Sequence, residues 1–319
     1  MTAALEGQTM DGLKGSDVLT LGEFTPDVLT FLLDRVAIQK RASIAAGSNY
    51  HPLAGKSVAV IMLKPSLRTR VSFEVAISRL GGTPIILGEG SAFSRDETVK
   101  DTVKVLERYV DCIVLRTFAQ SHVEEVAEHA SIPVINALTD DYHPCQVLAD
   151  LVTIRERKRR LVGLNAAYVG DGNNMANTLL IGSALAGMHL TVGCPEGHDP
   201  LPAALERAQR IAEFTGARLT VVRDPGAAVE GADVVITDTW ASMGQEAEHA
   251  ERVAIFTPYR VDAALMAKAA PDAMFLHCLP AHRGEEVTDE VIDSAASAVY
   301  DEAENRMHAQ KALLTMVMG

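Results

Sequence analysis

Hydrophobic and polar positions follow two patterns along the first half of the chain. Short apolar runs rich in β-branched residues predict buried strands, and longer stretches with an apolar residue every three or four positions predict helices. The pattern gives an N-terminal helix from a Thr25-Pro26 cap to about residue 45. It then predicts strands at 57–63, 83–87, 112–115 and 133–136, with helices that begin near residues 66, 99 and 121.

The same alternation returns in the second half. The pattern predicts a helix at 175–186 and strands at 166–169, 189–193, 218–222, 234–238, 252–256 and 274–277. Such alternation is typical of α/β proteins with parallel sheets. We therefore expect two doubly wound parallel-sheet domains joined by helices. The first spans residues 1–150, with a C-terminal helix in 296–319 packing back on it, and the second spans 151–295.

Composition narrows the class of protein. The 319 residues suffice for two domains, each with its own core. A formal net charge of −13 argues against nucleic acid or an anionic membrane as a partner. The four cysteines are widely spaced without a CxxC pair, no apolar run reaches membrane-spanning length, and the N-terminus does not read as a signal peptide. We expect a cytoplasmic protein.

The stretch Ser66-Leu67-Arg68-Thr69-Arg70 carries the densest chemistry. It lies at the junction between a predicted strand and the first turn of the helix that follows. Free backbone N–H groups and the positive end of the helix dipole suit an anion there, and arginine adds donors that match phosphate oxygens. The alternative to an anion-binding site is an ordinary capped helix N-terminus that faces solvent.

Further polar groups follow other strands or open helices, where ligands of α/β sheets bind. They are Arg116, His143 with Gln146, Asp238 with Ser242, and His277-Cys278 with His282 and Arg283. Each has a structural alternative, such as a surface charge, a helix cap or a buried thiol. No tight histidine spacing indicates a metal, and no Gly-x-Ser-x-Gly elbow supports a hydrolase. Gly170-x-Gly172 begins a dinucleotide fingerprint, but Met175 stands where the third glycine belongs.

Four motifs together resemble those of one family. Ser66-Leu-Arg-Thr-Arg70, His143-Pro-Cys-Gln146, Asp238-Thr-Trp-Ala-Ser242-Met-Gly244 and His277-Cys-Leu-Pro280 are similar to the signatures of the aspartate/ornithine carbamoyltransferase family. The resemblance covers the chain from about Leu19 to Leu314, and the last two motifs indicate its ornithine branch. It implies transfer of a carbamoyl group from carbamoyl phosphate to L-ornithine without a metal or other cofactor. The first domain would bind carbamoyl phosphate and the second L-ornithine.

The resemblance also implies roles for individual residues. Arg68, His143, Cys278 and Arg306 would be catalytic. Carbamoyl phosphate would be held by Ser66, Leu67, Arg68, Thr69, Arg116, His143, Gln146, Cys278, Leu279 and Arg306. Ornithine would be held by Asn174, Asp238, Ser242 and Met243.

Two positions depart from the family pattern. Leu67 stands where threonine is common, and Ala92 stands where the 88–96 loop often carries a glutamine that reaches a neighbouring subunit. The resemblance further implies a homotrimer or a multiple of trimers, and a part in arginine metabolism, with biosynthesis as the expected direction. Three alternatives stay open: a relative using another amine, an inactive carbamoyl-phosphate-binding protein, and an NAD-linked oxidoreductase.

Overall fold

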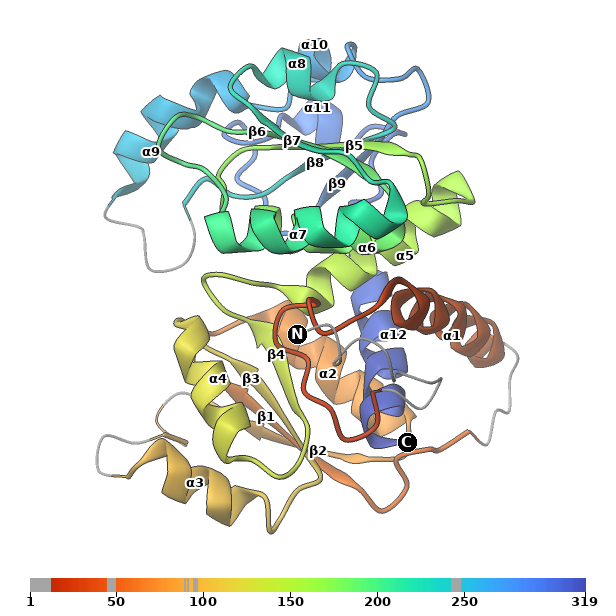
Figure 1. Ribbon diagram of the computed structural model, residues 1–319, viewed down its shortest axis with the longest axis vertical. Coiled ribbons are helices and arrows are strands. Elements are labelled where there is room, and N and C mark those ends of the chain that lie inside the picture. Colours follow the sequence, from red (N-terminus) through yellow and green to blue (C-terminus); the bar gives the residue numbers. More distant parts are fainter. Residues whose placement is uncertain (1–12, 45–49, 89, 91, 94–96, 242–247) are drawn as a thin grey trace. The chain divides into compact units, whose positions relative to one another are not determined.

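The computed structural model describes residues 13–44, 50–88, 90, 92–93, 97–241 and 248–319 (Figure 1). It divides into two compact units. Unit 1 comprises residues up to Leu148 together with Arg306–Gly319, and unit 2 comprises Ala149–Asn305. None of the helices formed by the described residues has both the length and the apolar character needed to cross a membrane.

Unit 1 contains a parallel sheet of four strands in the order β2-β1-β3-β4. Because β1 lies between β2 and β3, the chain reverses its direction of travel across the sheet at the β1–β3 pair. The elements in chain order are α1 (Pro26–Ile44), β1 (Ser57–Met62), α2 (Leu67–Arg79), β2 (Thr83–Leu87), α3 (Val99–Leu106), β3 (Cys112–Arg116), α4 (Gln120–His129) and β4 (Val134–Leu138).

Helices cover both faces of this sheet (Figure 1). Alternate side chains of a strand point to opposite faces, so Ala59 and Ile61 of β1 pack with Val103 of α3 and Val126 of α4. Helix α2 buries Phe73, Ala76 and Ile77 and contacts β1 and β2. Strands β1, β3 and β4 are therefore buried on both faces, which explains why they are nearly continuous apolar runs, whereas the edge strand β2 is only partly buried.

Unit 2 contains a parallel sheet of five strands in the order β7-β6-β5-β8-β9. Its reversal point lies between β5 and β8. The elements are β5 (Asn165–Val169), α6 (Asn174–Ala186), β6 (His189–Gly193), α7 (Pro202–Thr215), β7 (Leu219–Val222), α8 (Pro225–Val229), β8 (Val234–Thr237), α9 (His249–Phe256), the 3-10 turn η3 (Thr257–Tyr259), α10 (Ala263–Met266), β9 (Met274–His277) and α11 (Asp289–Ile292).

In Figure 1, α6 and α7 lie on one face of this sheet and α8, α10 and α11 on the other. A core cluster joins Val169 of β5 and Phe275 of β9 to Val229 of α8, Leu265 of α10 and Ile292 of α11. Two long helices, α5 (Pro144–Lys158) and α12 (Val299–Met318), each begin in one unit and end in the other. The expected fold, two parallel-sheet α/β domains connected by helices, is confirmed.

One predicted strand is wrong. Residues 252–256 belong to helix α9, not to a strand. The run Val253-Ala254-Ile255 has strand-like composition, but the buried side chains are Arg252 and Phe256, which are four residues apart and share one face of a helix. The sequence reading also missed α7, whose apolar face is built largely from the small residues Ala204 and Ala208.

Candidate functional site

In unit 1 the predicted anion-binding residues lie at the reversal point of the sheet. The turn from Lys64 to Thr69 follows β1, and Arg116 ends β3, the strand that pairs with β1. Ligands of open α/β sheets bind at this place, outside the carboxyl ends of the strands. Ser66 caps α2, with its side chain accepting a hydrogen bond from the Thr69 N–H at 3.3 Å. The capped helix start is therefore present, and it stands where a ligand site is expected.

Thr69 is the centre of a buried polar cluster. Its side chain is fully buried, and its Oγ1 accepts hydrogen bonds from Arg306 Nη2 at 2.7 Å and from Arg116 Nη1 at 3.4 Å. Arg116 also donates from Nε to the carbonyl of Lys64 at 3.1 Å. Thus α12 contributes Arg306, 237 residues away in sequence, to the same point as the α2 motif.

The surroundings of Thr69 are strongly cationic. Lys64 is buried, and its Nζ is 2.6 Å from Asp140 Oδ1 and lies over the Phe118 ring. Burial, and then the charges of Arg306, Arg116 and Lys64, lower the pKa of His143 well below its usual value. His143 is therefore a neutral imidazole at pH 7. The site presents fixed positive charge and a neutral hydrogen-bonding ring.

The remaining residues of the 66–70 motif differ in position. Arg68 is half-buried, and among the described residues no hydrogen-bond partner reaches its buried Nε. Leu67 exposes its side chain, so only its backbone is suited to a ligand in the site. Arg70 is exposed and lies 3.8 Å from Glu74, one turn along α2. Gln146 is fully buried in the first turn of α5, the helix that begins directly after His143.

In unit 2 a second polar cluster lies at the reversal point between β5 and β8. Asp238, which directly follows β8, accepts hydrogen bonds from the Thr239 N–H at 2.8 Å and from Asn173 Nδ2 at 3.0 Å. Asn173 caps α6, and its Oδ1 accepts from the Met175 N–H at 2.9 Å and from the Tyr168 hydroxyl at 3.1 Å. The sequence reading named the adjacent Asn174, a buried residue that opens α6, and overlooked Asn173.

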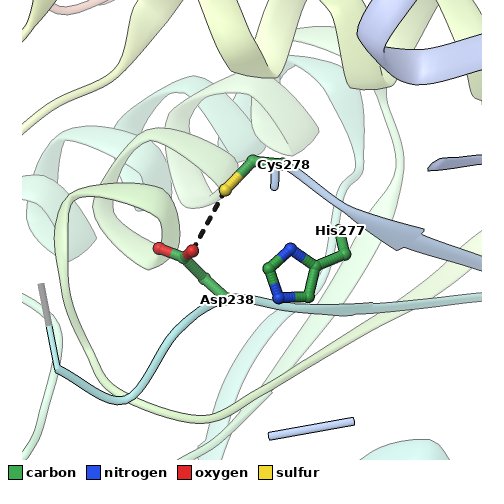
Figure 2. Close-up of side chains that lie close together, drawn as sticks. All are labelled: Asp238, His277 and Cys278. Atoms are coloured by element: carbon green, nitrogen blue, oxygen red, sulfur yellow. Dashed lines mark hydrogen bonds between the residues drawn. The ribbon is translucent and has the colours of Figure 1, made fainter. Parts of the chain in front are cut away.

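Cys278, which follows β9, completes this cluster (Figure 2). Its Sγ donates to Asp238 Oδ1 at 3.0 Å. Burial, and then the negative charge of Asp238, raise the pKa of the Cys278 thiol well above its usual value. The group is therefore a neutral thiol at pH 7, unlike the low-pKa thiolates that act as nucleophiles.

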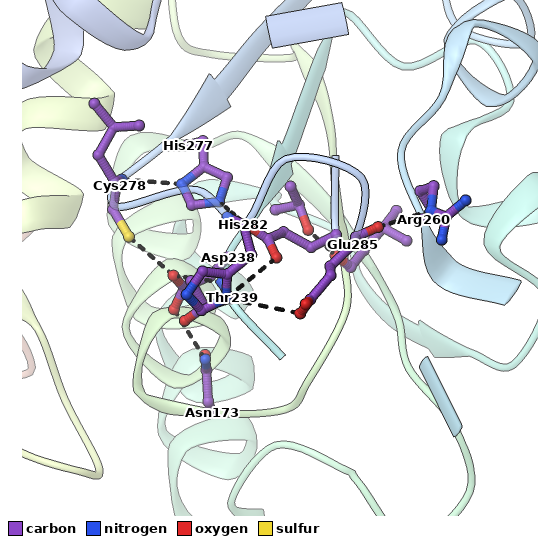
Figure 3. Close-up of polar contacts among 12 residues, drawn as sticks. Asn173, Asp238, Thr239, Arg260, His277, Cys278, His282 and Glu285 are labelled. Atoms are coloured by element: carbon purple, nitrogen blue, oxygen red, sulfur yellow. Dashed lines mark hydrogen bonds and ion pairs between the residues drawn. The ribbon is translucent and has the colours of Figure 1, made fainter. Parts of the chain in front are cut away.

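A second layer of contacts fixes the backbone around Cys278 (Figure 3). The Leu279 N–H donates to His277 Nδ1 at 2.9 Å, which leaves the proton of this ring on Nε2, facing Glu286 Oε1 at 3.0 Å. Glu302 Oε2 accepts from the His277 N–H at 2.9 Å. Leu279 has φ 56°, a left-handed conformation unusual for leucine. Because its N–H is engaged, only the carbonyl of Leu279 can face a ligand.

Asp238, His277 and Cys278 lie close enough to share a metal ion. However, both ring nitrogens of His277 already have partners, Leu279 N–H and Glu286, so an ion would have to displace one of them. These three residues are better suited to a hydrogen-bonding site than to a metal centre.

The partial glycine fingerprint has a structural cause. A Cβ on Gly172 would lie 2.3 Å from backbone atoms of Asp199 and Pro200, and the Gly172 N–H donates to the His198 carbonyl at 2.9 Å. Close backbone packing therefore requires this glycine. Met175, at the third glycine position, is buried in α6. Neither observation supports a dinucleotide.

Three predicted positions need separate comment. Ser242 and Met243 lie outside the described residues. Ala92 packs against the α3–α4 core of unit 1. The sequence reading also missed Lys64, which stands directly after a buried strand. An asparagine before an apolar run and a lysine at a strand end were the signals that could have identified Asn173 and Lys64.

Comparison with known proteins covers nearly the whole chain. Residues 16–156 match the family model for the carbamoyl-P binding domain of aspartate/ornithine carbamoyltransferase, and 162–317 match its Asp/Orn binding domain. Ornithine carbamoyltransferase of Anoxybacillus flavithermus is 50% identical over 319 residues, which span 100% of this chain and 99% of that protein. The enzyme of Symbiobacterium thermophilum is 52% identical over 311 residues, 97% of this chain and 100% of that protein.

Two solved structures show the same fold at high identity. Ornithine carbamoyltransferase from Pyrococcus furiosus superposes with a TM-score of 0.93 at 48% identity, covering 96% of this chain and 98% of that one. The protein from Gloeobacter violaceus gives a TM-score of 0.87 at 48% identity, covering 96% and 99% of the two chains.

Proposed function

Because this chain belongs to the aspartate/ornithine carbamoyltransferase family, we propose that it transfers the carbamoyl group of carbamoyl phosphate to the δ-amine of L-ornithine. The products are L-citrulline and phosphate. Relatives that are 50–53% identical over 93–100% of this chain are named ornithine carbamoyltransferase. The chain is therefore an enzyme of that class.

The cationic cluster of unit 1 supports a role in binding carbamoyl phosphate. Arg68 and Arg116 offer forked donors, and Thr69 and Ser66 offer hydroxyls at the positive end of α2. We assign the phosphate to Ser66, Arg68, Thr69, Arg116 and the backbone of Leu67. Arg306, His143 and Gln146 serve the carbamoyl end.

The buried carboxylate of Asp238 is the observation on which the assignment of ornithine as the substrate rests. Its carboxylate is buried and accepts three hydrogen bonds from the described residues, one fewer than its two oxygens can take. An ammonium group suits that position, whereas the carboxylates of aspartate would be repelled by it. We place the α-amino group of ornithine at Asp238, with Asn174, Ser242 and Met243 holding the rest of the amino-acid end.

The protonation states support direct attack of the amine on the carbamoyl carbon. The Cys278 thiol stays protonated because of its raised pKa, so it does not compete as a nucleophile and no carbamoyl–enzyme forms. We assign Cys278 to the reacting amine, and Cys278 together with the Leu279 carbonyl to the carbamoyl group. Neutral His143 donates one hydrogen bond to the carbamoyl oxygen, where negative charge develops.

Arg68 and Arg306 complete the catalytic set. As the bond between the carbamoyl carbon and the phosphate oxygen breaks, the electron pair leaves with the phosphate and Arg68 stabilises its charge, while Arg306 stabilises the charge on the carbamoyl oxygen. Once the carbon–nitrogen bond has formed, the attacking nitrogen loses a proton to the departing phosphate. No step requires a metal or an organic cofactor.

The wider biological assignments extend the same proposal. We propose a cytoplasmic enzyme of arginine biosynthesis that assembles as a homotrimer or a multiple of trimers. A related solved structure, 37% identical, is named an anabolic ornithine carbamoyltransferase from Campylobacter jejuni, which supports the biosynthetic direction. Light scattering on the purified protein tests the trimer, which requires a mass of three 34.2 kDa chains or a multiple of that.

An amine panel tests the reaction. Purified protein is incubated with carbamoyl phosphate and L-ornithine, N-acetylornithine, N-succinylornithine, putrescine or L-aspartate, and the ureido product is measured. We expect product with ornithine at a rate at least tenfold above every other amine. Product from aspartate or putrescine alone, or from none of the amines, would refute the proposal.

Two variants separate the roles proposed for the two clusters. Arg68→Ala should abolish turnover while the thermal unfolding midpoint stays within a few degrees of wild type, because this side chain serves the ligand. Asp238→Ala should raise the KM for ornithine or lower kcat far more than it weakens carbamoyl phosphate binding. Equal losses for both substrates in the Asp238 variant would contradict the assignment.

A further inference from the structure

A second group of metal-ligating side chains lies in unit 2, apart from the Asp238–Cys278 pair. His249 is the first residue of α9. His282 and Glu285, which Figure 3 labels, belong to the segment between β9 and α11. Glu285 Oε2 lies 3.0 Å from His249 Nε2 and 3.8 Å from His282 Nδ1. One ligand atom from each residue falls within 4.8 Å of the other two.

We propose that His249, His282 and Glu285 form a binding site for a divalent transition-metal ion of the Zn²⁺ class. Ligand atoms about 2.1 Å from a tetrahedral Zn²⁺ lie about 3.4 Å from one another, so small side-chain rotations complete the geometry. Two imidazoles and one carboxylate suit Zn²⁺, Co²⁺ or Ni²⁺, whereas Mg²⁺ and Ca²⁺ prefer oxygen ligands.

A buried carboxylate oxygen supports the proposal independently. Glu286 is fully buried, and its Oε1 accepts from His277 Nε2 and from the His282 N–H. Its Oε2 has no hydrogen-bond partner among the described residues and lies 3.9 Å from His282 Nδ1. A buried acceptor without a donor is costly, and a cation held by His282 would compensate its charge. Glu285 and Glu286 together supply the two negative charges that match a divalent ion.

Nearby cations do not occupy the proposed ligand atoms. Arg260 donates from Nε to the backbone carbonyl of Glu285, not to its carboxylate. Arg283 is bound to Asp289 and Asp293. The side chains of His249 and His282 are each 43% exposed and that of Glu285 is 30% exposed. An ion can therefore reach the site from solvent and keep water in its remaining positions.

Sequence spacing hides this site. His282 and Glu285 are three residues apart, but His249 precedes them by a long stretch that contains β9. A bound ion would link the start of α9 to the segment that carries Glu286. The metal-site proposal does not depend on the transferase proposal, because metal binding is measured without either substrate.

Calorimetric titration with Zn²⁺ and visible absorption with Co²⁺ test the proposal on the full chain without an affinity tag. We expect one saturable site for each metal. The spectrum should show Co²⁺ d–d bands without the thiolate-to-metal charge-transfer band that a Cys278 ligand would produce. His249→Ala and His282→Ala should each weaken binding at least tenfold, and the double variant should abolish it.

Two control variants separate this site from other ligands. Cys278→Ser removes the thiol of the Asp238 cluster, and His129→Gln removes an imidazole from unit 1; both should bind the metal as wild type does. His249 is half-exposed at a helix start, so its variant should keep the wild-type circular dichroism. Absence of saturable binding, or binding lost in Cys278→Ser and kept in His249→Ala, would overturn the proposal.

Discussion

Replacing Thr69 by valine tests the polar cluster of unit 1 most directly. Valine has nearly the shape of threonine but lacks the hydroxyl, so Thr69→Val removes an acceptor while filling the same volume. Arg306 loses a 2.7 Å hydrogen bond and Arg116 loses a 3.4 Å one. Thr69→Ser is the matched control, because it keeps the hydroxyl and removes only a buried methyl group.

The magnitude follows from the charged donors. A hydrogen bond to a charged group contributes about 1.5–3 kcal/mol, and the contact to Arg116 is long and belongs at the weak end or below it. We expect Thr69→Val to lower the free energy of unfolding by about 2–3 kcal/mol. The control loses about 0.8 kcal/mol for the methyl group, with a small further loss for the space left.

Urea unfolding followed by circular dichroism measures the stability, and kinetics with varied carbamoyl phosphate measures the function. Thr69→Val should have the lower midpoint of the two variants and a KM for carbamoyl phosphate raised at least tenfold, since the hydroxyl also serves the phosphate. Thr69→Ser should stay within threefold of wild type. A valine variant as stable as the serine variant, with unchanged KM, would refute the assignment of Thr69 as the centre of this cluster.

Two further predictions rest on shifted pKa values. Asp238→Asn removes the charge that helps hold the Cys278 thiol protonated, so iodoacetamide at pH 8 should alkylate Cys278 faster than in wild type; the other three cysteines are buried, and an unchanged rate would count against the pair. For His143 the folded-state pKa lies below the unfolded value of 6.5, so unfolded chains bind the extra proton and stability falls as the pH drops below 6.5. The slope is at most about 1.4 kcal/mol per pH unit, and His143→Asn should reduce it; the same slope in both proteins would contradict the buried neutral imidazole.

The sequence predicted those features of the site that depend only on residues close together in the chain. Ser66 caps α2 through the N–H of Thr69, three residues away, and β1, the strand before this turn, is a buried apolar run. Local patterning determines such features because a helix cap and a strand period involve only nearby residues. The strand predicted at 252–256 was wrong because the prediction also relied on local composition. The strand-like composition was given more weight than the four-residue spacing of the two buried side chains, which indicates a helix.

Contacts between distant segments were decided only by the tertiary structure. Nothing in the local pattern brings Arg306 of α12 to Thr69 of α2, or His249 of α9 to Glu285. Asn173 reaches Asp238 because β5 and β8 are neighbours at the reversal point of the sheet.

The protonation states likewise depend on burial, which the sequence does not encode locally. His143 is neutral because the fold buries it and then surrounds it with Arg306, Arg116 and Lys64, and Cys278 stays a thiol because of burial and then because Asp238 lies against it. The sequence by itself thus determined which chemical groups are present, their local elements and the fold class. The tertiary structure decided which groups meet and which carry charge, because both follow from distances across the fold.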